Sequence, residues 1–365
     1  MNTRTLVTIV LALVLICIVM AVSGLMAWGG WVNPNAFSVA PVWQQAYADA
    51  QSMKIIDLTG DGQAELFIQG PRNASIYSAS GEQLSSFDFP NLLATTLGDV
   101  TGDGVEDVVS FYSDWTNGSL QVFSQGAQAA AYPVSNISEA RRAAVMRFPE
   151  GPQIVVGDAN GLLVGLGVDG GERWRLNVGG HDEIRGLDDT RVSGQAWLAA
   201  ANHDGTVMLL DAQGAALWQY TLAGGLRRLR AYDLNGDGTS ELALGGELGT
   251  LALLDAAGGS ELWSRPLGQA VSEIREAEAD GDPASRELIV GGKDGGVWAY
   301  TLTGEKLWSR SMTDKVTEIS SVDLDGDGAA EIIIGDETGE VKLFTGSGEG
   351  FTLLSVSGLV NRIDG

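Results

Sequence analysis

The chain has 365 residues with 47 acidic and 22 basic side chains, so its formal net charge is −25. A protein this acidic repels the phosphate backbone, which excludes nucleic acid as a partner. Hydrophobic residues make up 44% of the chain and charged residues only 19%, which is enough apolar material for a folded core. The 50 glycines follow no collagen-like period and indicate many tight turns between short strands.

Residue types that often carry catalysis are scarce. Cys17 is the only cysteine and lies in an apolar N-terminal stretch, so the rest of the chain has no disulfide, no cysteine-based zinc site and no thiol nucleophile. The only histidines are His181 and His203, and each is expected to lie in a loop or turn of the repeats described below. We therefore predict no catalytic residues, no cofactor-binding residues and no enzymatic activity.

Residues 1–28 are predicted to anchor the chain in a membrane. Leu6 to Trp28 carries no charge over about 23 residues, long enough for a helix to cross a hydrocarbon core of about 30 Å. Arg4 precedes this stretch and no basic residue follows it until Lys54, so the N-terminus is expected in the cytoplasm and the rest of the chain outside the cell or in the periplasm. Small residues around Ala21 leave a cleaved signal peptide, and hence secretion, as the alternative.

Residues 29–41 contain two prolines and no hydrophobic period, so they are expected to form a linker. The folded domain is then expected to span residues 42–365. Within it, an acidic phrase recurs, beginning at residues 57, 99, 233, 278 and 323 as DLTGDGQAEL, DVTGDGVEDV, DLNGDGTSEL, EADGDPASREL and DLDGDGAAEI. The intervals are 42, 134, 45 and 45 residues, which indicates a repeat of about 45 residues with two copies lacking the phrase.

A tryptophan recurs in step with the acidic phrase. Trp174, Trp218, Trp263 and Trp308 are 44 to 45 residues apart, each shortly after a glycine, and Trp43 and Phe351 extend the series. Because they occupy one position of the repeat, we interpret these side chains as packing residues between repeats. A platform for binding sugars is the alternative.

Each repeat contains four short apolar runs separated by Gly-rich turns, as in VTEISSVDL, AEIIIGD, EVKLFTG and FTLLSVSG after Val316. Four strands per repeat of 40 to 50 residues are typical of a β-propeller blade. The sequence therefore predicts an all-β, seven-bladed propeller with blades beginning near residues 53, 92, 138, 182, 226, 271 and 316. Spare strands at residues 42–48 and 359–363 leave an eight-bladed alternative open.

The acidic loops are predicted to bind Ca²⁺. Each complete copy offers side-chain oxygens at positions 1, 3 and 5, a glycine at position 6 and a carboxylate at position 9, and Ca²⁺ prefers six to eight oxygen ligands. The predicted ligands are Asp57, Thr59, Asp61 and Glu65; Asp99, Thr101, Asp103 and Asp107; Asp233, Asn235, Asp237 and Glu241; Asp323, Asp325, Asp327 and Glu331.

The loops are not equivalent. The loop from Asp323 to Glu331 has four carboxylates and is expected to bind best, whereas threonines at position 3 weaken the first two loops. The loop from Glu278 to Glu287 has a proline at position 6 and one extra residue, so whether it binds calcium is left open. Glu150 and Asp188, in the two repeats without the phrase, are not assigned as ligands.

These loops resemble the FG-GAP/VCBS repeats of integrin α-chain propellers and many prokaryotic surface proteins, over most of residues 53–358. That resemblance implies a calcium-binding propeller for adhesion or ligand binding, with an extracellular protein or glycan as partner. The tryptophan series is similar to that of quinoprotein-like propellers, which include quinone-dependent dehydrogenases and a non-catalytic lipoprotein of outer-membrane assembly. The alternative functions are therefore an envelope scaffold or a quinone-dependent dehydrogenase.

One basic cluster stands out in the acidic chain. Arg227, Arg228 and Arg230 are expected at the start of the inner strand of the fifth blade. Ion pairing with neighbouring carboxylates is the favoured interpretation, and a site for an anion or a partner is the alternative.

Overall fold

The computed structural model describes residues 52–88, 92–113, 118–125, 127–134, 137, 139–180 and 182–355. The expected anchor and linker, Trp43, His181 and the two spare strands lie outside these residues. In the described part of the chain, no helix is long and apolar enough to cross a membrane.

The described residues form 28 strands in seven four-stranded sheets, which we number 1 to 7 along the chain. Sheets 1 to 4 contain β1 (Ser52–Ile56), β2 (Glu65–Gln69), β3 (Asn73–Tyr77), β4 (Gln83–Asp88); β5 (Leu92–Gly98), β6 (Asp107–Ser113), β7 (Gly118–Ser124), β8 (Ala127–Val134); β9 (Ala140–Phe148), β10 (Gly151–Asp158), β11 (Leu162–Gly167), β12 (Glu172–Asn177); β13 (Ile184–Val192), β14 (Gln195–Asn202), β15 (Thr206–Leu210) and β16 (Ala216–Thr221). Sheets 5 to 7 contain β17 (Leu226–Tyr232), β18 (Glu241–Gly246), β19 (Thr250–Asp255), β20 (Glu261–Pro266); β21 (Val271–Ala277), β22 (Glu287–Gly292), β23 (Gly296–Tyr300), β24 (Lys306–Ser311); β25 (Val316–Val322), β26 (Glu331–Asp336), β27 (Glu340–Phe344) and β28 (Gly350–Ser355).

Consecutive strands are hydrogen-bonded neighbours in every sheet, and the pairs with a described register are antiparallel. This is the repeating unit of a β-propeller, so the prediction of an all-β fold with seven four-stranded blades is confirmed. The first strands begin within two residues of the predicted starting points. Turns dominated by glycine allow this regularity, because the chain must reverse direction after every five to nine residues.

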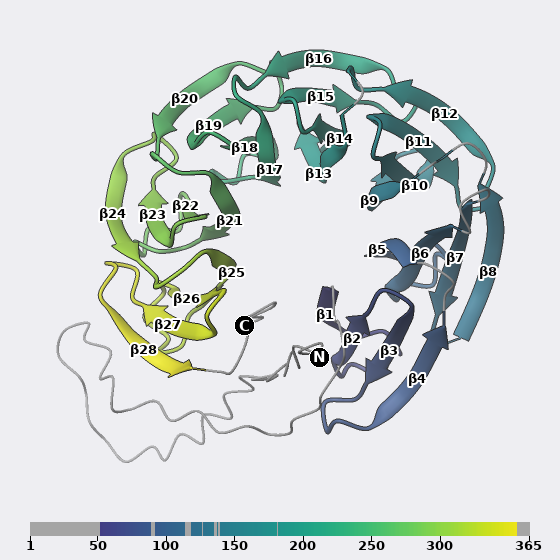
Figure 1. Ribbon diagram of the computed structural model, residues 1–365, viewed down its shortest axis with the longest axis horizontal. Coiled ribbons are helices and arrows are strands. Elements are labelled where there is room, and N and C mark those ends of the chain that lie inside the picture. Colours follow the sequence, from purple (N-terminus) through teal and green to yellow (C-terminus); the bar gives the residue numbers. More distant parts are fainter. Residues whose placement is uncertain are drawn as a thin grey trace, which may run out of the picture. The chain divides into compact units, whose positions relative to one another are not determined.

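The described residues divide into two compact units, residues 52–274 and residues 275–355. The first unit holds sheets 1 to 5, the second holds sheet 7, and β21 of sheet 6 crosses the boundary between them. Within the first unit, the first strands β5, β9, β13 and β17 contact one another in succession, and the fourth strands lie on the opposite, outer side (Figure 1). Residues at the start of these first strands are therefore brought together from distant parts of the sequence.

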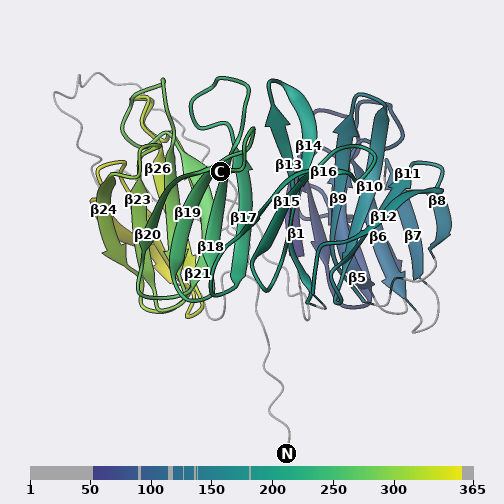
Figure 2. The same cartoon turned by 90° about the horizontal axis from the view of Figure 1, so that it is seen from above.

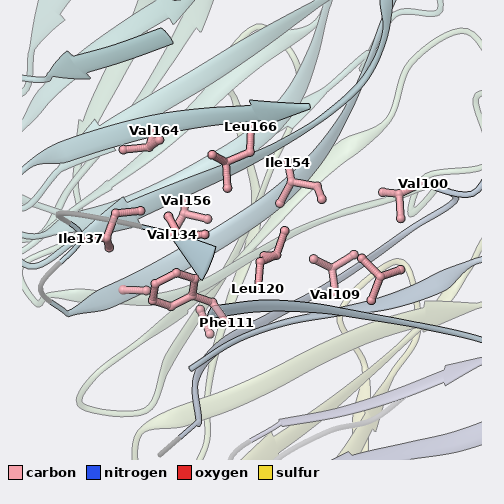
Figure 3. Close-up of a cluster of buried hydrophobic side chains, with 13 residues drawn as sticks. Val100, Val109, Phe111, Leu120, Val134, Ile137, Ile154, Val156, Val164 and Leu166 are labelled. Atoms are coloured by element: carbon pink, nitrogen blue, oxygen red, sulfur yellow. The ribbon is translucent and has the colours of Figure 1, made fainter. Parts of the chain in front are cut away.

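The core consists of apolar side chains packed between neighbouring sheets. Between sheets 2 and 3, Phe111 and Leu120 from β6 and β7 pack against Ile154 and Leu166 from β10 and β11 (Figure 3). These side chains are almost completely buried, and each contributes about 1.5–3 kcal/mol of hydrophobic stabilisation. The apolar runs of the second and third strands are thus explained by burial of both faces of each sheet.

Trp174, Trp218, Trp263 and Trp308 lie on the fourth strands, and hydrogen bonds join two of them to the next sheet. The indole N–H of Trp218 donates to the Ala256 carbonyl at 2.7 Å, and that of Trp308 donates to the Gly346 carbonyl at 2.7 Å. A Cβ atom on Gly259 would lie only 2.5 Å from the Trp218 ring, which explains the glycine in that turn. The interpretation of these tryptophans as packing residues is confirmed.

Sheets 3 and 4, which lack the acidic phrase, connect their first two strands by tight hairpins. In sheet 3, the β9–β10 ladder runs to Phe148 and resumes at Gly151. In sheet 4, Ser193 and Gly194 form the turn with φ values of 51° and 77°, the left-handed pair that suits a two-residue hairpin. The β13–β14 hairpin is correspondingly long and lies beside the β17–β18 loop (Figure 2).

Candidate functional site: the acidic loops

The acidic loops connect the first and second strands of sheets 1, 2, 5, 6 and 7. In sheet 1, for example, β1 ends at Ile56 and β2 begins at Glu65, so the predicted ligands occupy the connection itself. The acid at position 9 is the first residue of the second strand in every case, or position 10 in the loop with the extra residue. Each loop therefore has one end fixed in a sheet.

The first aspartate of the loop holds the turn by accepting main-chain hydrogen bonds. The carboxylate of Asp57 accepts from the N–H groups of Gly60 at 2.7 Å and Gly62 at 2.9 Å. Although burial raises the pKa of Asp57, the hydrogen bonds from Gly62 and Gly60 dominate and lower it below its usual value. Both glycines have positive φ, 74° and 82°, which explains why the phrase contains glycine at positions 4 and 6.

Asp99, Asp233 and Asp323 repeat this arrangement. Asp99 accepts from Gly102 and Gly104, and Asp323 accepts from Gly326 and Gly328. Asp233 accepts from the N–H of Asp237 and Gly238.

The acid at the start of the second strand reaches back to the residue after the first aspartate. Glu65 accepts from the N–H of Leu58 at 2.8 Å, and Glu331 accepts from that of Leu324 at 2.9 Å. Asp107, Glu241 and Glu287 make the same bond at 2.8, 2.9 and 2.7 Å, to Val100, Leu234 and Ala279 respectively. These acids are buried, so one carboxylate oxygen of each is committed to closing the loop and the other is available to a second partner.

The residue at position 3 decides whether that second oxygen meets a donor or another carboxylate. The Thr59 hydroxyl lies 3.5 Å from the second oxygen of Glu65, and the Thr101 hydroxyl lies 3.4 Å from that of Asp107. The Asn235 amide lies 3.4 Å from the second oxygen of Glu241. An ionised aspartate has no proton to donate, so Asp280 and Asp325, which occupy position 3 in the other two loops, cannot donate a hydrogen bond to the closing acid.

In each of three loops, three carboxylates lie close together. Oxygen atoms within 4.8 Å of one another come from Asp57, Asp61 and Glu65; from Glu278, Asp280 and Glu287; and from Asp323, Asp325 and Asp327. Among the residues that the structure describes, the Asp99–Asp107 and Asp233–Glu241 loops do not form such a group. The sequence prediction therefore named two of the three groups and left the Glu278 loop open.

The Glu278 loop contains oxygens that no donor satisfies. One oxygen of Glu278 and one of Glu287 are buried without a hydrogen-bond partner among the described residues. Glu287 is fully buried, and burial followed by the charges of Asp280 and Glu278 raises the pKa of Glu287 to about 7. A buried, unpaired carboxylate is costly unless it is neutralised, and the oxygens of this loop fit a hard cation such as Ca²⁺.

The Glu278 and Asp323 loops adjoin each other within the second unit. The Ala330 N–H donates to the Glu278 carbonyl at 2.6 Å. A pocket of about 470 Å³ is lined by acidic residues of both loops, Asp280, Asp325, Asp327 and Glu331, and by Trp308. Burial and then the charges of Asp325 and Asp327 raise the pKa of Glu331 to about 7, so this pocket concentrates negative charge.

Other residues considered from the sequence make ion pairs or polar contacts. His203 follows β14 in a turn, as predicted, and its Nδ1 lies 3.1 Å from an oxygen of Asp182. Arg227 pairs with Glu247 at 2.9 Å, and both Arg228 and Arg230 pair with Glu273 at 3.4 and 3.1 Å. Ion pairing of the arginine cluster is therefore confirmed.

Comparison with known proteins supports the fold. Residues 203–349 match the family PQQ_2, described as "Outer membrane protein assembly factor BamB". No curated protein matches the chain. This family agrees with the resemblance to quinoprotein-like propellers, and the match spans three of the four later tryptophans; an FG-GAP/VCBS repeat is not shown.

Solved structures of similar fold share little sequence with the chain. Saccharomyces cerevisiae Sqt1 is 14% identical with a TM-score of 0.68, covering 84% of this chain and 86% of that one. The computationally designed Ika8 protein is 17% identical with a TM-score of 0.63, covering 85% and 88%. BBS1N, solved in complex with ARL6DN, is 15% identical with a TM-score of 0.58, covering 85% and 96%. At these identities the likeness shows the propeller fold alone.

Proposed function

We propose that the chain is a non-enzymatic, membrane-anchored β-propeller that serves as a protein-interaction scaffold and is stabilised by calcium in its acidic loops. The observation that carries the scaffold role is the match of residues 203–349 to the family of an outer membrane assembly factor. A propeller offers many loops on a rigid frame, which suits the binding of other proteins, although the fold by itself is compatible with many functions.

The calcium role is supported by the chemistry of the loops. Carboxylate oxygens gather in three of them, and two of those, the Glu278 and Asp323 loops, have Asp at position 3. Calcium bound there would offset the repulsion between carboxylates and satisfy the buried oxygens of Glu278 and Glu287. We expect the Asp99 and Asp233 loops to bind more weakly, because a threonine or an asparagine already serves the second oxygen.

Calorimetric titration of the full chain with Ca²⁺ in detergent tests this proposal. We expect two or three sites, and a melting temperature that rises when Ca²⁺ replaces EGTA. The matched control is Asp169→Ala, an exposed aspartate in a turn of sheet 3 that should leave the number of sites unchanged. If the heat of Ca²⁺ binding does not saturate and the melting temperature is the same in EGTA and in Ca²⁺, the calcium role is wrong.

The scaffold role is tested separately from calcium. Titration with pyrroloquinoline quinone in the presence of Ca²⁺, followed by absorbance, should show no saturable binding, whereas tight binding would favour the quinone-dependent dehydrogenase. Crosslinking in native membranes should join the chain to other envelope or surface proteins. The anchor is checked by carbonate extraction, which should leave the chain in the membrane fraction; release would favour a cleaved signal peptide and secretion.

A further inference from the structure

The first strands of sheets 3, 4 and 5 carry an unusual concentration of arginine. Arg141 and Arg142 lie on β9, Arg185 on β13, and Arg227 and Arg228 on β17. Each strand has a β-bulge near its start, where the register shifts, and the extra residues are Arg141, Arg185 and Arg227. A bulge redirects a side chain relative to the regular strand, so Arg141, Arg185 and Arg227 occupy equivalent places in three consecutive sheets. Arg142 and Arg228 directly follow two of these bulges.

A side-chain contact joins the arginines of β9 and β13, and β13 in turn lies against β17. The Arg142 Nε–H donates to the main-chain carbonyl of Arg185 at 3.0 Å, across from β9 to β13. Arg228 and Arg230 share the single carboxylate of Glu273, and Arg141 and Arg185 share that of Glu183. Burial, and then the charges of Arg228, Arg185 and Arg230, lower the pKa of Arg142 to about 10, so these three guanidinium groups lie within electrostatic reach of Arg142.

The carboxylates around the cluster do not neutralise it fully. Arg227 pairs with Glu247 and Arg141 also pairs with Glu139, while Asp188, which is near Arg230, accepts the Ala231 N–H. Arg142 donates to two main-chain carbonyls and makes no ion pair with a carboxylate among the described residues. The Arg185 Nε–H is buried and has no acceptor in the described part of the chain.

We propose that Arg142, Arg185 and Arg228 form a binding site for an oxyanion, that is, a phosphate, sulfate or carboxylate group. Guanidinium groups bind such groups through paired N–H donors, and a half-buried setting strengthens the attraction. A bound oxyanion would accept from the Arg185 Nε–H and offset the repulsion between Arg142 and its neighbours. In a chain of net charge −25, a basic site of this kind favours small anions that can reach it over extended polyanions.

Thermal melts of the full chain with sulfate test the site, because sulfate stays soluble with millimolar calcium. We expect the melting temperature to rise with sulfate and to saturate, beyond the effect of sodium chloride at equal ionic strength. Arg142→Gln should weaken apparent binding at least about tenfold. The matched control is Arg147→Gln on the same strand, where an exposed arginine pairs with Glu106 at 2.6 Å; it should bind sulfate like the unmodified chain.

Arg185→Lys keeps the charge but removes the Nε–H, and it should also weaken binding about tenfold if that donor reaches the anion. Replacing sulfate by phosphate in EGTA, or by succinate, then identifies whether a tetrahedral or a carboxylate oxyanion binds better. Sulfate stabilisation that never saturates would overturn the proposal even if a variant failed to fold. Equal loss of binding in Arg142→Gln and Arg147→Gln would overturn it as well, because the effect would then be one of net charge.

Discussion

The acidic loops of the first unit and those of the second share one backbone design but differ in the kind of residue at position 3. In both units the first aspartate accepts from loop N–H groups and the acid of the second strand closes the loop. In the first unit, position 3 is Thr59, Thr101 or Asn235, and each lies near the second oxygen of the closing acid. In the second unit, position 3 is Asp280 or Asp325, and each belongs to a group of three carboxylates, whereas among the described residues of the first unit only the Asp57 loop forms such a group.

The same loop can therefore be stabilised in two ways, by a donor within the chain or by a bound cation or proton. A hydroxyl or amide donor satisfies the closing acid from within the chain, whereas an aspartate leaves it dependent on a cation or on a proton. The Asp233 loop is further held by the neighbouring hairpin, since the Gly194 N–H donates to the Gly238 carbonyl at 2.7 Å. We therefore expect the second unit to depend on calcium more than the first.

Removal of calcium should have the largest effect. At a free Ca²⁺ concentration about ten times the Kd, each site adds about 1.4 kcal/mol, so three sites add about 4 kcal/mol. With an unfolding entropy of about 2.1 cal/mol/K per residue, a domain of about 300 residues should lose about 6 °C in melting temperature when EGTA removes the calcium. Hydrogen exchange should show the main loss of protection at residues 278–287 and 323–331, and equal loss at residues 99–107 would contradict the difference between the units.

The calcium-free protein should become less stable as the pH rises. Burial raises the folded-state pKa of Glu241, Glu287 and Glu331 to about 7, so the folded state binds more protons than the unfolded state above pH 4.5. The stability that these three glutamates contribute is therefore fully present below about pH 4.5 and is lost as the pH rises through 7. Chemical denaturation in EGTA at pH 5 and pH 8 should differ by about 1 kcal/mol for each of these glutamates. Saturating Ca²⁺ should remove most of the part of this pH difference that comes from Glu287 and Glu331. A free energy of unfolding in EGTA that rises from pH 5 to pH 8 would refute this account.

Exchange of the residue at position 3 should transfer the calcium dependence between units. Asp325→Asn copies Asn235, so it should raise the free energy of unfolding in EGTA by about 1 kcal/mol and lower it in Ca²⁺ by about the same amount. The melting temperature should shift in the same directions. The reverse change, Asn235→Asp, should destabilise the protein in EGTA and add calcium affinity to the Asp233 loop. Calorimetry and melts in both buffers measure the two variants, and a change of the same sign in both buffers would contradict the role given to this position.

The hairpin of sheet 4 should be insensitive to calcium and give the smallest effect. Gly194 has a φ of 77°, so Gly194→Ala should cost about 1 kcal/mol through backbone strain, although nothing lies within 4 Å of the added Cβ. The loss should be the same in EGTA and in Ca²⁺. A loss seen only in EGTA would mean that this hairpin supports the Asp233 loop in place of calcium.

Much of the fold could be predicted because its signals are local and repeated. The phrase beginning at Asp57 and its copies, and the series from Trp174 to Trp308, recur at a fixed interval, and a repeat of four strands fits few architectures. The turn glycines also followed from the local sequence. The group formed by Glu278, Asp280 and Glu287 was left open, because the proline at residue 283 and the extra residue break the motif. In the structure, Glu287 still closes this loop by accepting the Ala279 N–H.

The sequence by itself determined the class of the protein, the number of sheets and the position of the acidic loops, because each depends on interactions within a repeat of about 45 residues. Only the tertiary structure decided which carboxylates meet and how the arginines are arranged. Arg142, Arg185 and Arg228 are each 43 residues from the next and come together because successive first strands pack side by side. Electrostatic interactions act over distances in space, so the charge surrounding a residue follows from its neighbours in the fold and not from its neighbours in the chain.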